Sequence, residues 1–179
     1  QFARHLAEAG LAITSGLALG IDAAAHRGAL AARGRTIAVL GCGLDRVYPR
    51  GHAQLASEVA ANGALVSDLP TGIPPLKHHF PRRNRLISGL AAGTLVVEAA
   101  LQSGSLITAR LAGEQGREVF AIPGSIHSPL SRGCHRLIRH GAKLVESVDD
   151  IFCELGALLA AAGPAVRAEA TDTQEVSGS

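Results

Sequence analysis

Short apolar runs alternate with longer amphipathic stretches along most of this chain. The runs are rich in Val, Ile, Leu and Ala, as buried strands are, and they cover residues 11–15, 36–40, 64–67, 94–98, 119–122 and 143–145. The stretches predicted as helices cover residues 2–9, 21–32, 51–61, 81–91, 104–115 and 133–140. Strands that alternate with helices in this way predict an α/β fold with a mostly parallel sheet and helices on both faces.

Small residues follow four of the predicted strands. One such loop could be explained by the tight turns that glycine allows. Together, four of them predict a groove at the carboxyl ends of the strands, where parallel sheets bind ligands and backbone N–H groups can approach an anion. The loops are Ser15-Gly16, Gly41-Cys42-Gly43, Ser103-Gly104-Ser105 and Pro123-Gly124-Ser125.

Composition narrows the protein class. The 179 residues favour one domain with a proper core, which we place at residues 1–162. Residues 163–179 are polar, acidic and aperiodic, and are expected to be a disordered linker. We find no apolar run of membrane-spanning length and no signal-peptide pattern. Three widely spaced cysteines suit a reduced, cytoplasmic protein.

The densest charge cluster is Arg82, Arg83 and Arg85, preceded by Lys77. No acid lies between Asp68 and Glu98, and the cluster falls at the predicted start of a helix, which already carries partial positive charge. A solvated surface helix would normally mix Glu among the arginines. The pattern therefore favours an anionic ligand, and among anions it favours phosphate.

The segment Ser103-Gly104-Ser105 opens another predicted helix, and Thr108 lies one turn further on. Either serine could cap this helix. Capping needs only one of them, so the two hydroxyl groups and the Gly104 backbone could together hold a phosphate.

Enzyme signatures are sparse. Gly41 and Gly43 follow a strand, but Arg46 stands where a dinucleotide-binding fingerprint needs its third glycine. The histidines and cysteines have no metal-ligand spacing. Glu98 ends an apolar strand and could be catalytic, although bracing the arginine helix is the simpler role. We predict no catalytic residue, no metal and no cofactor.

Five segments occur in fixed order between residues 10 and 148. They are residues 15–26 with Gly28-Ala29-Leu30, residues 36–41 through Tyr48-Pro49, Phe80-Pro81 with Arg83-Asn84-Arg85, residues 103–109, and Gly116-Arg117 through Pro123-Gly124. Together they resemble the DNA-processing protein A family (DprA/Smf), and the ordered set is far more specific than any one segment.

This resemblance implies a Rossmann-like three-layer sandwich that binds single-stranded DNA, forms homodimers and loads the RecA recombinase in natural transformation, without a catalytic step. Arg83 and Arg85 would contact phosphates and Asn84 would order their loop, while Arg82 and Lys77 would add charge. The pocket would be lined by Gly16, Gly20, Gly43, Ser103, Gly104, Ser105 and Thr108.

The chain also departs from the family. The resemblance would also imply an opening strand with a Gly-Ser-Arg loop and a C-terminal winged-helix-like domain, and we expect neither within these 179 residues. A competing prediction is a Rossmann-like nucleotide phosphoribohydrolase acting on nucleoside monophosphates, with Glu98 as its catalytic group. The Pro-Gly-Gly-x-Gly-Thr loop of such enzymes is absent, which favours DNA binding.

Overall fold

The computed structural model describes residues 1–161, so the predicted linker at 163–179 lies outside it. The strands are β1 (Ile13–Ser15), β2 (Thr36–Val39), β3 (Gly63–Val66), β4 (Gly93–Val96), β5 (Glu118–Ala121) and β6 (Lys143–Leu144). The helices are α1 (Phe2–Glu8), α2 (Ile21–Ala31), α3 (Ala53–Asn62), α4 (His79–Gly89), α5 (Gly104–Glu114), α6 (Arg132–Arg139) and α7 (Val148–Ala161), with short 3-10 turns at Arg50–His52 and Pro129–Ser131.

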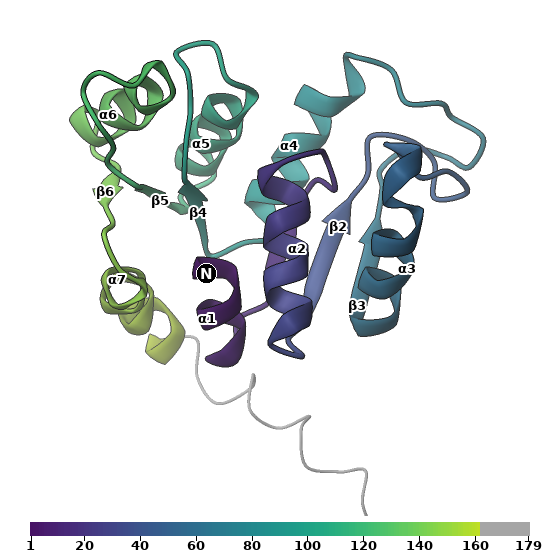
Figure 1. Ribbon diagram of the computed structural model, residues 1–179, viewed down its shortest axis with the longest axis horizontal. Helices are drawn as coiled ribbons and strands as arrows, with labels where there is room; N and C mark the ends of the chain where they lie inside the picture. Colours follow the sequence, from purple (N-terminus) through teal and green to yellow (C-terminus); the bar gives the residue numbers. More distant parts are fainter. Residues whose placement is uncertain (162–179) are drawn as a thin grey trace, which may run out of the picture.

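The strands form two three-stranded sheets, in the orders β1-β2-β3 and β4-β5-β6. Every pairing is parallel: Ser15 aligns with Ala38, for example, and Val96 with Ala121. The predicted α/β fold with parallel strands is therefore confirmed, although the strands are divided between two sheets. Figure 1 shows the two halves side by side, with α2 and α3 beside β2 and β3, and α5 and α6 beside β4 and β5.

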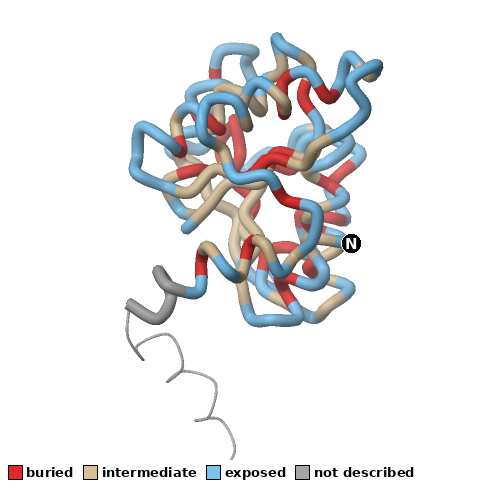
Figure 2. The backbone as a smooth tube through the Cα atoms, turned by 90° about the vertical axis from the view of Figure 1, so that its left-hand side faces the viewer, coloured by how far each residue is buried: buried red, intermediate tan, exposed pale blue. Residues whose placement is uncertain are grey.

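The core has three parts. One lies under α2 and α3 and includes Leu40 and Cys42, and another lies under α5 and α6 and includes Cys134. The third joins the two halves, because Phe120 of β5 and Leu6 of α1 are buried together, with Ile13 of β1 packed against them. Figure 2 shows these buried stretches inside the molecule and exposed loops around it.

Both faces of β2 are covered. Ala38 and Val39 are each fully buried, and consecutive side chains of a strand point to opposite faces. The sheet therefore has packing partners on both sides, as an α/β sandwich requires. The candidate site described below lies at the carboxyl ends of the strands.

Helix α7 was not predicted from the sequence. Asp149 and Asp150 lie in its first turn, where carboxylates favour a helix, and the Asp150 carboxylate accepts hydrogen bonds from the backbone N–H groups of Glu146 and Ser147. Ile151 and Leu155 bury one face of α7 in the joining core. The four-residue spacing of Ile151 and Leu155, directly after the acidic Asp150, is the sequence pattern that could have predicted this helix.

Among residues 1–161, no helix combines the length and apolarity needed to cross a bilayer.

Candidate nucleic-acid interface

Arg83 lies inside the protein. Only 4% of the surface of Arg83 is exposed. Its Nη1 donates hydrogen bonds to the carbonyl oxygens of Gly16, at 2.8 Å, and of Val39. These carbonyls mark the carboxyl ends of β1 and β2, so the guanidinium group joins the two strand ends to α4. The structure therefore brings Arg83 and the Gly16 turn together, as predicted. The hydrogen bonds that its Nη1 group donates are made to carbonyl oxygens of this chain.

Among the described residues, no carboxylate forms an ion pair with Arg83. Burial lowers the pKa of Arg83, and the nearby negative charge of Asp22 opposes that shift. The Nε group is buried and has no hydrogen-bond partner within residues 1–161, and the guanidinium carbon lies 5.9 Å from the centre of the Phe80 ring. A buried cation with an unused donor is costly, so nearby negative charge, such as that of Asp22, is favourable.

Gly16 is required by this arrangement. A Cβ atom added at Gly16 would lie 2.6 Å from Nη2 of Arg83, closer than real atoms approach. Any larger residue would therefore displace the guanidinium group.

The turn from Gly16 to Gly20 is held from several sides. Leu17 is buried although its φ of 60° is in the left-handed region, and its carbonyl accepts a hydrogen bond from Nδ1 of His52 at 2.8 Å. Asp22 accepts from the Ser15 hydroxyl at 2.9 Å and from the Ala18 N–H at 3.1 Å. Gly20, with φ of 83°, precedes α2 and provides no side-chain cap.

Asp22 and His26 are four residues apart on α2, but the hydrogen-bond partner of His26 is Thr36. His26 is fully buried, and its Nδ1 lies 2.7 Å from the Thr36 hydroxyl. That hydroxyl donates its only proton to the carbonyl of Ile13, so Nδ1 of His26 must be the donor. Burial lowers the pKa of His26 to about 4, so the ring is neutral at pH 7.

The arginine cluster is not wholly without acidic partners, contrary to expectation. Arg85 donates from Nη2 to Asp68 at 2.7 Å, with 47% of the Arg85 side chain exposed. Lys77 and Arg82 are also exposed, and within residues 1–161 neither forms an ion pair. Asn84 is half-buried. The start of α4 therefore presents two unpaired cations and a third whose partner a phosphate could replace.

Gly43 has a packing role in the structure. A Cβ atom there would lie 2.6 Å from both the Asp45 carboxylate and the Pro70 carbonyl. Its N–H donates to the carbonyl of Ile73 at 3.0 Å. That N–H is therefore already used within the chain.

The start of α5 forms a separate group. The Ser103 hydroxyl caps the helix by accepting from the N–H of Ser105 at 3.3 Å, and the two hydroxyl oxygens lie 2.6 Å apart. Gly104 is exposed and Thr108 half-buried. This group follows β4 of the second sheet, and no hydrogen bond between described residues joins it to Arg83 or Gly16.

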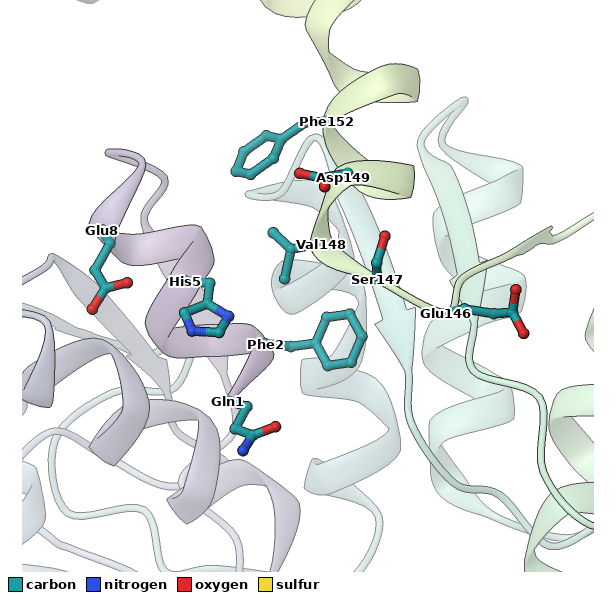
Figure 3. Close-up of a pocket in the computed structure, with 9 residues that line it drawn as sticks. All are labelled: Gln1, Phe2, His5, Glu8, Glu146, Ser147, Val148, Asp149 and Phe152. Carbon is teal, nitrogen blue, oxygen red and sulfur yellow. The ribbon is translucent and has the colours of Figure 1, made fainter.

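Glu98 is exposed and forms no ion pair within the described residues, so the expected bracing of the arginine helix does not occur there. The same residues contain no cluster of three His, Cys, Asp or Glu side chains able to hold a metal ion. A cleft of about 470 Å³ lies between α1 and the start of α7 (Figure 3). Its lining includes Glu8, Glu146 and Asp149, which do not suit an anion.

The contact between Tyr48 and Phe80 was not predicted from the sequence. Tyr48 lies against Phe80, with ring centres 5.4 Å apart. The two residues are far apart in the chain, so no local pattern connects them. The only hint was that both occur in segments shared with one family.

The fold and this site define a Rossmann-like α/β protein with a cationic surface at the carboxyl ends of its strands. Residues 1–156 match the DNA recombination-mediator protein A family, and the chain belongs to that family.

The chain is similar to several known members. It is 58% identical to protein Smf of Escherichia coli K12 over 152 residues, which cover 84% of this chain and 41% of that protein. It is 54% identical to the DNA processing protein DprA of Streptococcus pneumoniae R6 over 144 residues, or 80% of this chain and 51% of that one. The chain thus spans about half the length of these relatives, or less.

Two solved structures share the fold. The X-ray structure of Streptococcus pneumoniae DprA matches with a TM-score of 0.78 and 50% identity, over 86% of this chain and 55% of that one. DNA processing protein A of Helicobacter pylori, whose structure describes a single-stranded DNA binding mode, matches with a TM-score of 0.78 and 33% identity, over 87% of this chain and 71% of that one.

Proposed function

We propose that this chain binds the backbone of single-stranded DNA at the start of α4, as part of DNA processing in transformation and recombination. The observation that carries the proposal is that Lys77 and Arg82, close in sequence to the buried Arg83, are exposed and form no ion pair with any described residue. The Helicobacter pylori relative, which binds single-stranded DNA, supports the same ligand.

The proposed role of each residue depends on whether it is buried or exposed. Arg83 would fix the Gly16 turn from inside the protein, while Lys77, Arg82 and Arg85 would contact phosphates from the surface. Asn84 lies within α4, so the position predicted as a loop is helical and no loop-ordering role is proposed for it. The loops containing Gly20 and Gly43, and the group formed by Ser103, Gly104, Ser105 and Thr108, would line the path further along the strand ends.

Binding of this kind is mainly electrostatic. It should depend strongly on salt and weakly on sequence. Glu98 is exposed and forms no ion pair within the described residues; the proposal assigns it no catalytic step. Assembly into a homodimer and loading of RecA onto the bound strand complete the proposed role.

The test is a fluorescence-anisotropy titration with a short oligothymidylate at several salt concentrations. Arg82→Ala and Arg85→Ala should each weaken binding by about 1–3 kcal/mol and reduce the slope of log K against log salt by about 0.7. Asp68→Asn should tighten binding, because it frees Arg85 from its ion pair. Arg4→Ala is the matched control, since Arg4 pairs with Glu8 on α1.

Two results would contradict the proposal. One is an equal loss of affinity in Arg4→Ala and in the α4 variants, because the effect would then reflect net charge alone. The other is equal affinity for duplex and single strands at one salt concentration, because the proposed site receives a flexible backbone.

A further inference from the structure

A second cleft lies beside Tyr48, whose ring contacts Phe80 of α4. It has a volume of about 310 Å³ and is lined by Arg46, Val47, Tyr48, Arg50 and Pro75. This volume is at the lower end of the range of ligand pockets, about 300–1,000 Å³, and suits a small planar group.

Tyr48 gives the cleft an aromatic wall that is held in place. The residue is 49% exposed, and its ring packs against the half-buried Phe80 with a 5.4 Å separation of centres and a 39° angle between planes. Phe80 in turn lies 5.9 Å from the buried guanidinium carbon of Arg83. Tyr48 is therefore the outermost member of a stack that begins in the core, and its exposed surface can receive another ring.

The charges beside this ring suit a nucleotide. Arg46 and Arg50 both line the cleft. Arg46 contacts the Asp45 carboxylate at 3.4 Å, whereas Arg50 has no carboxylate partner in the described part of the chain. Proteins that hold single strands combine aromatic side chains, on which bases stack, with a positively charged groove, and the described residues that line the cleft include no acid.

We propose that Tyr48 stacks on one base of the bound strand, and that Arg50, with Arg46, holds the phosphate beside that base. This inference rests on the proposed DNA-binding function and adds a base-recognition subsite to it. The strand would pass from the cations of α4, across Phe80, to Tyr48. A base on this platform also gives a physical reason for choosing single strands, because a paired base is not free to stack on a side chain.

The test compares Tyr48→Ala with Tyr48→Phe, which keeps the ring. Titrations use an oligothymidylate and an abasic oligonucleotide of the same length. Tyr48→Ala should bind oligothymidylate about ten-fold more weakly than the parent, in the range for one stacked base, and Tyr48→Phe should match the parent. The abasic strand should not distinguish the three proteins. Arg50→Ala should lower the salt slope by about 0.7.

A direct measurement covers the case in which Tyr48→Ala unfolds. The parent is irradiated with an oligonucleotide that carries 5-iodouracil, and the adduct is located by mass spectrometry. We expect the adduct on Tyr48. If the parent binds but Tyr48→Ala binds equally well, or if the adduct lies elsewhere, the subsite is wrong and the α4 interface stands. If the parent does not bind the strand, both proposals fail.

Discussion

At the scale of single residues, the position of Arg83 determines how the cationic cluster is used. The three arginines look equivalent in the sequence, but the structure separates them into a buried Arg83, an exposed Arg82 and an Arg85 paired with Asp68. Arg83 holds the carboxyl ends of two strands together through their carbonyl oxygens. Its replacement should therefore disturb the fold as well as the site, which is why the binding test relies on Arg82 and Arg85.

His26 gives the residue scale a pH-dependent prediction. Burial keeps it neutral by lowering its pKa from 6.5 to about 4, while Asp22 opposes and His52 adds to the shift. Below pH 6.5, His26 is protonated in the unfolded chain but stays neutral in the folded chain. Stability present at pH 7 is therefore lost as the pH falls toward 4. The loss attributable to His26 is about 3 kcal/mol in the free energy of unfolding.

Urea unfolding of the parent and of His26→Gln from pH 7 to pH 4 measures this effect. Glutamine does not titrate, so the curve of the variant against pH should be flatter, whatever its absolute stability. Parallel curves for the two proteins would show that His26 does not carry the pH dependence.

At the scale of elements, the sequence predicted what depends on local pattern. All six predicted strands and all six predicted helices are present, each end within two residues of its expected position. The ion pair of Arg85 with Asp68, the burial of Arg83 and the Tyr48–Phe80 contact were not predicted, because each depends on how distant segments meet. The split into two sheets was missed for the same reason.

Helix α7 provides the prediction at this scale. Ile151 is 2% exposed in the joining core, so Ile151→Ala should lower the free energy of unfolding by about 2–5 kcal/mol. Cys153→Ser, on the exposed side of the same helix, should change it by less than about 0.5 kcal/mol. Urea denaturation measures both. A small effect of Ile151→Ala would mean that α7 contributes little to the packing.

At the scale of the whole molecule, the two sheets share no strand pairing within the described residues, so side-chain packing connects them. Phe120 of the second sheet is buried with Leu6, and Ile13 of the first sheet packs against the same cluster. Because this joining core draws on both halves, neither sheet can be lost without exposing apolar surface of the other. We therefore expect the molecule to unfold as one unit.

The cysteines make this expectation measurable. Cys42 belongs to the core of the first half and is 1% exposed, and Cys134 belongs to the core of the second half and is fully buried. Burial raises the pKa of both thiols, which further slows their reaction in the folded state. With Cys153 replaced by serine to remove the exposed thiol, pulsed labelling across a urea series should show both becoming reactive at the same urea concentration. Phe120→Leu should lower both midpoints equally; a shift of the Cys134 midpoint alone would mean that the halves unfold independently.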